Sequence, residues 1–328
     1  MNVSVSVVIP TVGRPDLLAE VLRALEQQTG SFEVVVVCDG EHAETRRMSE
    51  AWCSPFPLKW IFHPVNLGQS HARNLGVERS EGGILVFLDD DTLPAPGWLQ
   101  AHLRRHASPD SKRVVVGRLS HEYAGSPRTD LERFMRAVAD REQAKLESSL
   151  ARMEEDTARE LWAGLNASLP KTLFIASGGF DVALRHIEED AELATRILNL
   201  GAEFVYEPDA LLYHRSTKDL AQLHMTRAPL FAKADLYRLL EKRQSAAKWP
   251  ALASLIYGKG AQKLKHRLAW RLPVLASAIG FLCRIGGEAL GAEFLFRQWL
   301  DLAFMTRYWG QVKAQGLSIN DVRRLMEL

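Results

Sequence analysis

The first 216 residues alternate between short apolar runs and segments with helical periodicity. Val3–Ile9, Phe32–Cys38 and Ile84–Leu88 are rich in Val, Ile, Leu and Phe, which is typical of strands buried in a parallel sheet. After the first run, Pro15 suits the first turn of a helix. The same alternation predicts strands near Leu58–Phe62, Val114–Gly117, Phe204–Tyr206 and Leu211–Tyr213, and helices near Glu41–Trp52, Ser70–Arg79, Gly97–His106 and Glu189–Leu200.

Strands that alternate with helices at this pitch form βαβ units. We therefore expect an α/β fold with a doubly wound, mostly parallel sheet. Asp130–Trp162 is long, charged and favours a helix, and beyond Pro229 the pattern changes to helices with basic and apolar faces. The sequence thus predicts a domain over residues 1–226 and a C-terminal helical extension over residues 227–328.

The composition, 47% hydrophobic and 25% charged, is that of a soluble globular protein. The first ten residues lack a basic region and a small-residue cleavage site, so we expect no secretory signal. Cys38, Cys53 and Cys283 have no metal or disulfide spacing. A reducing cytoplasm is the compartment that fits these features best.

The net charge of +1 conceals an uneven distribution. Residues 1–226 hold 24 Lys and Arg against 33 Asp and Glu, a net of −9, whereas residues 227–313 hold 15 against 5, a net of +10. The apolar run Leu272–Cys283 is shorter than the roughly 20 residues of a membrane span, and Arg284 interrupts its extension. This tail would either bind the inner face of the cytoplasmic membrane or pack as a cap or dimer surface.

Three carboxylates, Asp89, Asp90 and Asp91, directly follow the apolar run Ile84–Leu88. If that run is a strand of a parallel sheet, they lie at the carboxyl edge, where open α/β folds bind ligands. Clustered carboxylates suit a hard divalent ion such as Mg²⁺ or Mn²⁺. The structural alternative is a solvated acidic turn.

Two further polar segments follow predicted strands. Asp39 ends the second strand, where a carboxylate can accept hydrogen bonds from a nucleoside, or can simply form an Asp-Gly turn. Gly68, Ser70 and Arg73 then open a helix whose N-terminus and guanidinium could cradle a diphosphate. An ordinary capped helix with a surface arginine is the alternative.

A fourth acidic segment comes later in the chain. The glycines of Gly178–Asp181 allow close backbone approach to a ligand, and the acids of Glu188–Leu193 stand at a predicted helix start. The helix dipole alone would favour acids there. An aspartate beside an acceptor hydroxyl could instead act as a general base.

Six motifs appear in a fixed order: Val-Ile-Pro-Thr, Asp39-Gly, Asn-x-Gly-x-x-x-Ala-Arg-Asn, Leu-Asp-Asp-Asp, Gly-Gly-Phe-Asp and Glu-Asp-x-Glu-Leu. Over roughly residues 3–216 the chain therefore resembles the family 2 glycosyltransferases, which are inverting enzymes with the A-type nucleotide-sugar-binding fold. Each motif is weak alone, but their order and spacing make the match strong.

The resemblance implies a role for each matched residue. Five residues would bind the donor: Thr11, Asp90, Asp39 at the nucleoside, Arg73 near the diphosphate and Asp89 towards the ribose. Asp91 and His214 would bind the metal ion. Asp190 would be the general base. Because Glu188 and Glu189 directly precede Asp190, the base could be a neighbouring acid instead. His214 could instead be an ordinary surface or core histidine.

The implied activity is transfer of a sugar from a nucleotide diphosphate sugar to an acceptor hydroxyl, in polysaccharide or glycolipid assembly, with a glycan or lipid-linked acceptor. A nucleotidyltransferase would want a Gly-rich loop after the first strand, whereas Pro10–Pro15 has one glycine. No Gly-x-Gly-x-x-Gly follows a strand, which disfavours a dehydrogenase. A non-catalytic module that binds a sugar or a lipid carrier is an alternative function. We find no nucleic-acid-binding motif and expect no nucleic-acid partner. The chain could form an oligomer.

Overall fold

The computed structural model describes residues 5–106, 112–123, 126–127, 129–152, 166–185, 187–216, 220–240 and 260–326. The chain divides into two compact units: an N-terminal unit of residues 1–124 and 141–216, and a helical unit of residues 125–140 and 217–328. The predicted boundary at residues 226 and 227 differs from this division, because residues 125–140 and 217–226 fall in the helical unit. The end of the predicted helix 130–162 and residues 241–259 of the basic tail lie outside the described residues.

One eight-stranded sheet forms the centre of the N-terminal unit, in the order β3-β2-β1-β4-β7-β6-β8-β5. The strands β3, β2, β1 and β4 run parallel, β7 is antiparallel to both of its neighbours, β6 and β8 are parallel, and β5 is antiparallel to β8. Their bounds are β1 Val5–Thr11, β2 Phe32–Asp39, β3 Leu58–His63, β4 Ile84–Leu88, β5 Thr92–Pro94, β6 Arg113–Tyr123, β7 Asn166–Pro170 and β8 Glu203–Ser216.

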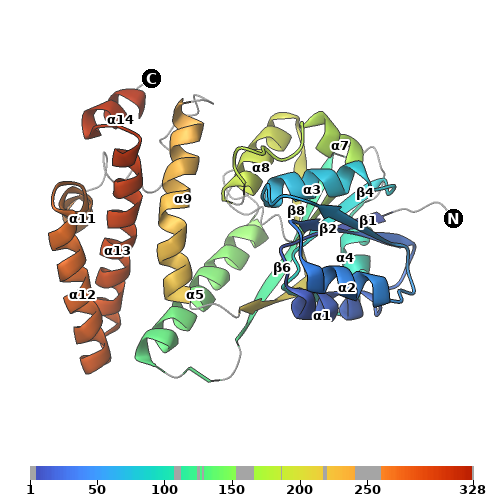
Figure 1. Ribbon diagram of the computed structural model, residues 1–328, viewed down its shortest axis with the longest axis horizontal. Helices are drawn as coiled ribbons and strands as arrows, with labels where there is room; N and C mark the ends of the chain where they lie inside the picture. The colour runs from blue at the N-terminus through green and yellow to red at the C-terminus, as the bar shows by residue number, and fades with distance from the viewer. Residues whose placement is uncertain are drawn as a thin grey trace. The chain divides into compact units, whose positions relative to one another are not determined.

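Helices cover both faces of this sheet (Figure 1). Alternate residues of β1 point to opposite faces, so Val7 and Ile9 join one core with α1 and α4, whereas Val8 joins another with α3, α7 and α8. Burial on both faces explains why these strands lack polar alternation. The helices are α1 Pro15–Leu25, α2 Ala43–Ala51, α3 Gln69–Glu78, α4 Trp98–Arg104, α7 Lys171–Ala176 and α8 Glu189–Asn199, and α5 Asp130–Arg152 runs from the helical unit into this one.

The predicted mostly parallel α/β sheet is confirmed, with three differences. β7 was not predicted, because Asn166–Pro170 contains two polar residues and a proline and therefore lacks a strand pattern. It lies between β4 and β6, although more than 40 residues separate it from either strand along the chain. β5 is too short to give a pattern, and the two strands predicted near residues 204 and 211 are one strand, β8.

The helical unit contains α9 Leu220–Leu240, α11 Gly260–Arg271, α12 Pro273–Leu290, α13 Glu293–Ala314 and α14 Ile319–Met326. Its core centres on Tyr308 and Trp309 of α13, which pack edge to face with ring centroids 4.9 Å apart. Tyr308 donates a hydrogen bond of 2.5 Å to Asp235 on α9, and Trp309 Nε1 donates one of 3.0 Å to His266 on α11. These two hydrogen bonds thus join α13 to α9 and to α11.

The apolar run of the tail continues further than its sequence suggested. α12 is 18 residues long and has a mean hydropathy of 1.3, so by length and composition this one helix among the described residues could cross a membrane. Helices of soluble proteins also meet this criterion, so the prediction that the run is too short for a membrane span stays a prediction. Small residues of α12 (Ala276, Gly280 and Gly287) are buried against the unit, while most of its large apolar side chains face outward.

Candidate functional site

The acid triplet lies at the carboxyl edge of the sheet, as the sequence predicts, because it directly follows β4. The adjacent strand β1 ends at the same edge and contributes Thr11 and the loop residue Arg14. Thr11 Oγ1 donates a hydrogen bond of 2.5 Å to Asp90. Arg14 binds Asp90 through Nε at 3.2 Å and through Nη2, and binds Asp91 through Nη1 at 2.6 Å.

Burial and these contacts have opposite effects on the pKa of the middle acid. Asp90 is 1% exposed, and this burial raises its pKa to about 6 even though Arg14 and the Thr11 hydroxyl oppose the shift. Asp90 therefore faces protein rather than solvent, and its contacts hold the neighbouring Asp91 in place. The predicted contacts of Thr11 and Asp90 with a donor stay predictions.

Asp91 faces His214 across the edge of the sheet. β5 pairs with β8 so that Thr92 stands opposite His214, and the Arg215 amide donates to the Asp91 carbonyl at 2.9 Å. As a result, His214 Nε2 lies 3.7 Å from Asp91 Oδ1. A carboxylate oxygen and an imidazole nitrogen at this separation suit a shared divalent cation.

The described residues would supply only part of a coordination shell for such a cation. Among the residues that the structure describes, no group of three or more His, Cys, Asp or Glu side chains is placed to hold a metal ion. Mg²⁺ is commonly held by one or two protein ligands together with substrate phosphates and water. The pair of Asp91 and His214 fits that second type of site.

A buried chain of charges joins the acid triplet to α8. Arg73 of α3, which is 2% exposed, donates through Nη2 to Asp89 and through Nη1 to Glu189, each at 2.9 Å. Gln69 also donates to Asp89, at 2.8 Å. Burial lowers the pKa of Arg73, but the carboxylates Asp89 and Glu189 outweigh that effect and raise it. Because carboxylates already occupy both of its terminal nitrogens, a diphosphate contact of Arg73 stays a prediction.

The start of α8 presents two acids with different surroundings. Glu189 is buried, and burial first, then repulsion by Asp190, raises its pKa to about 7 against the opposing effect of Arg73. Asp190 is half-buried and its Oδ1 accepts the Ala191 amide at 2.8 Å. Glu188, just before the helix, has a φ of 65° and is the one non-glycine residue with positive φ in the described part of the chain. Such strain is common where a site fixes the backbone.

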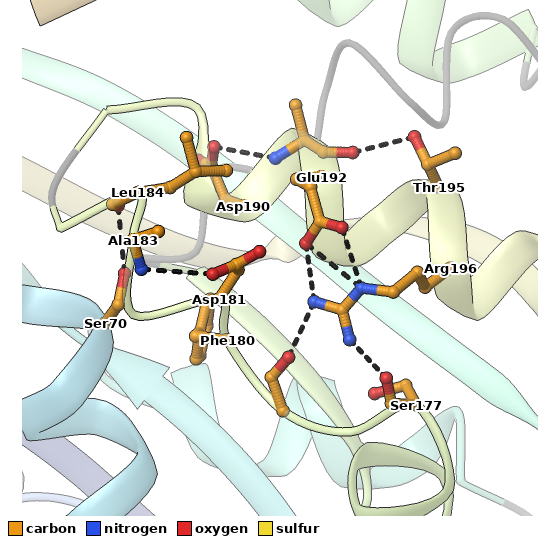
Figure 2. A network of polar contacts seen from close by, with 12 residues as sticks. Ser70, Ser177, Phe180, Asp181, Ala183, Leu184, Asp190, Glu192, Thr195 and Arg196 are labelled. Atoms are coloured by element: carbon orange, nitrogen blue, oxygen red, sulfur yellow. Dashed lines mark hydrogen bonds and ion pairs between the residues drawn. The ribbon is translucent and has the colours of Figure 1, made fainter. Parts of the chain in front are cut away.

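A second guanidinium ties α8 to the loop of the Gly-Gly-Phe-Asp motif, as Figure 2 shows. Arg196 donates from Nε and Nη2 to the buried Glu192, and also to the carbonyls of Ser177 and Gly179. The last of these bonds is 2.6 Å long. Because Arg196 and Glu192 both lie on α8, this clamp fixes the loop relative to the helix that carries Asp190.

Asp39 lies at the end of β2, where the sequence placed it, but its carboxylate is only 1% exposed. Its two oxygens accept the amides of Leu67 and Gly68 at 2.8 and 2.7 Å. Gly68 has a φ of 102°, and a Cβ there would lie 2.7 Å from the Cβ of Arg185. Asp39 thus shapes the entry to α3, and its predicted nucleoside contact stays a prediction.

Sequence reasoning missed Arg14, Gln69 and Arg196 as parts of this site, and it did not find the partner of Glu192, which lies in the Glu-Asp-x-Glu-Leu motif. Arg14 could have been found, because a cation in the loop after the first strand shares the sheet edge with the acids. The i,i+4 spacing of Glu192 and Arg196 indicates a helical ion pair, but not its bonds to the Ser177 loop.

The model of the family described as "Glycosyl transferase family 2" matches residues 6–172. The chain belongs to this family. The match covers β1 to β4, the acid triplet and β7, and the resemblance deduced from the six sequence motifs is confirmed.

Two relatives with named activities are similar in sequence to this chain. The chain is 33% identical over 200 residues to a validoxylamine A glucosyltransferase of Streptomyces hygroscopicus, covering 54% of this chain and 46% of that protein. It is 28% identical over 219 residues to a pre-mycofactocin glycosyltransferase of Mycobacterium tuberculosis, covering 64% and 42%. The chain thus spans less than half the length of these curated relatives.

Two solved structures share the fold. A mannosyltransferase of Pyrobaculum calidifontis, in complex with GDP-Man and Mn²⁺, superposes with a TM-score of 0.60 at 21% identity, covering 93% of this chain and 85% of the other. TarS 1–349 of S. aureus, in complex with UDP, gives 0.51 at 17% identity, covering 96% and 92%. The A-type glycosyltransferase fold with C-terminal helices is therefore confirmed.

Proposed function

We propose that this glycosyltransferase moves a sugar, with inversion, from a nucleoside diphosphate donor to an acceptor hydroxyl. The observation that carries the proposal is the chain Asp89–Arg73–Glu189, which connects the acid triplet with the acids at the start of α8. One end would bind the leaving nucleotide and the other would hold the base. Donor and acceptor groups would thus be positioned by one network, and positioning is a large part of catalysis.

Asp190 is our assignment for the base. Glu189 is engaged by Arg73, whereas Asp190 is half-buried and follows the strained Glu188. Asp190 would accept the proton of the acceptor hydroxyl as its oxygen attacks the anomeric carbon, while the bond from that carbon to the diphosphate breaks. An inverting transfer of this type needs no covalent enzyme intermediate.

On the donor side, Asp91 and His214 would hold a divalent ion, Mg²⁺ or Mn²⁺. When bound, such an ion neutralises the charge that develops on the departing diphosphate. The P. calidifontis mannosyltransferase, which shares the fold, is in complex with Mn²⁺, and this supports the proposal.

A panel of UDP-, GDP- and dTDP-sugars tests the proposal in two ways. We expect one donor to raise the melting temperature of the full chain in Mn²⁺ and to be hydrolysed slowly, and we expect both effects to disappear with excess chelator. Stabilisation by a donor that survives the chelator would contradict the metal assignment. The absence of stabilisation by every donor of the panel would contradict nucleotide-sugar transfer itself.

We further propose that α12 places the enzyme on the cytoplasmic face of a membrane, near a lipid-linked or growing glycan acceptor. Its outer side carries large, exposed apolar residues: Val274, Leu275, Ile279, Phe281, Leu282, Ile285 and Leu290. Exposed cations of the adjacent α11, Arg267 and Arg271, suit anionic headgroups. Apolar burial and basic attraction together favour an interfacial helix, with each cation contributing about 1 kcal/mol.

Flotation with anionic vesicles tests this second proposal. We expect the full chain to float with phosphatidylglycerol vesicles, less so at high salt, and we expect Phe281→Glu with Leu282→Glu to stay in the soluble fraction. Val182→Glu, which alters an exposed apolar residue of the N-terminal unit, is the matched control. If the wild type fails to float with any vesicle, α12 covers a protein surface instead and the acceptor is soluble.

A further inference from the structure

Arg14 holds two of the three acids that the donor side of the site presents. It contacts both oxygens of Asp90 and one oxygen of Asp91. Its side chain is 30% exposed, against 1% for Asp90 and 16% for Asp91. A guanidinium that binds two carboxylates at once is a fixed positive charge inside the acid cluster.

This positive charge adjoins the proposed metal ligand. Arg14 binds Oδ2 of Asp91, and the other oxygen, Oδ1, faces His214 Nε2. A cation held by Oδ1 and His214 would therefore share the carboxylate with the guanidinium. At a pH at which Asp90 is ionised in both chains, Arg14, Asp90 and Asp91 carry a net charge of −1 together. Asp90 and Asp91 carry −2 at that pH once a neutral residue replaces Arg14.

We propose that Arg14 is a charge gate, which keeps the affinity for a divalent cation low until a nucleoside diphosphate supplies further negative charge. The inference rests on the proposed function, because it takes Asp91 as a metal ligand. It explains why the described residues offer two ligands and a competing cation rather than a closed carboxylate cage. The metal would thus enter the site together with the donor.

The expected effect is large enough to measure. A unit charge about 6 Å from a divalent ion changes its binding about tenfold even with the dielectric constant of bulk water, and more at a lower effective value. At a pH that keeps Asp90 ionised, Arg14→Gln should therefore bind Mn²⁺ at least about tenfold more tightly than the wild type in the absence of nucleotide. Arg14→Lys, which keeps the charge, should bind Mn²⁺ like the wild type.

Mn²⁺ titration of the full chain, followed by the electron paramagnetic resonance signal of the free ion, measures this affinity directly. The titration is run without nucleotide and then with UDP and with GDP as probes. Arg104→Gln, which removes an exposed arginine that pairs with Asp209, controls for a change in overall charge. We expect that control to match the wild type.

Arg14→Gln leaves the buried Asp90 without its cation, and this could disturb the fold. Two further variants therefore change the net charge of the cluster in other ways. Asp90→Asn combined with Arg14→Gln restores the net charge of −1 and should return Mn²⁺ affinity to the wild-type range. Asp90→Asn alone leaves no net charge and should bind Mn²⁺ more weakly. Circular dichroism checks that each variant keeps the fold.

The outcomes separate the gate from the proposed function. If Arg14→Gln binds Mn²⁺ no more tightly than the wild type while a nucleotide promotes binding in the wild type, the gate is refuted and metal-assisted transfer stands. If Arg14→Gln binds Mn²⁺ more tightly but neither nucleotide promotes binding in the wild type, Arg14 weakens metal binding, but the nucleotide-dependent gate and the proposed donor site are both refuted. If neither chain binds Mn²⁺ under any condition, both are refuted.

Discussion

Substitution of Glu189 by Gln should make the stability of the protein less dependent on pH. Glu189 is 5% exposed. Burial first, and then repulsion by Asp190, raises its pKa from 4.5 to about 7, although Arg73 opposes the shift. A glutamine has the shape of the protonated acid, and its amide oxygen can still accept the hydrogen bond from Arg73 Nη1.

The sign of the effect follows from proton linkage. Because the pKa is raised in the folded state, folding binds a proton between pH 4.5 and about 7, and the associated stabilisation is lost as the pH rises through that window. A shift of this size corresponds to about 3 kcal/mol, and loss of the charge-assisted hydrogen bond offsets about 1 kcal/mol of the gain. We therefore expect Glu189→Gln to be about 2 kcal/mol more stable than the wild type at pH 8 and no more stable at pH 5.

Thermal unfolding of both proteins at pH 5, 6, 7 and 8 provides the measurement. For a unit of about 200 residues, 2 kcal/mol corresponds to roughly 4–8 °C in melting temperature. Glu44→Gln removes a carboxylate whose side chain is 76% exposed and should show no such trend. Parallel curves for Glu189→Gln and the wild type across the four pH values would refute the idea that this carboxyl titrates in the folded protein.

Three other substitutions test two residues of the site and one buried polar network of the N-terminal unit. Asp91→Asn should weaken UDP or GDP binding at least about tenfold in Mn²⁺ but not in chelator, and unchanged calorimetric affinity would contradict its role. Asp190→Asn should retain donor binding and slow transfer by about 10²–10⁴-fold, whereas near wild-type turnover would mean that the base lies elsewhere. Asn166→Leu removes the acceptor of the buried Trp98 and His102 side chains and should cost about 2 kcal/mol or more. A melting temperature equal to that of the wild type would show that this polar network is dispensable.

Local patterns in the sequence determined the sheet edge and its acids. Ile84–Leu88 is wholly apolar, so it forms a strand buried on both faces, and the residue that follows such a strand must emerge at the edge of the sheet. Asp89, Asp90 and Asp91 were therefore placed correctly without any tertiary information. The same holds for Asp39 and for the acids at the start of α8, because strand ends and helix starts have short-range signals.

The tertiary structure alone decided which of these groups meet. Arg73 and Glu189 are 116 residues apart, and Thr11 and Asp90 are 79 apart, so no periodicity links them. Their pairing depends on the strand order, including the antiparallel β7 between β4 and β6. Side-chain partners across a fold depend on packing and burial of the whole sheet, whereas strands and helix ends depend on neighbouring residues. For this reason the sequence revealed the acids, and the fold revealed that arginines hold five of them. Arg14 holds Asp90 and Asp91, Arg73 holds Asp89 and Glu189, and Arg196 holds Glu192.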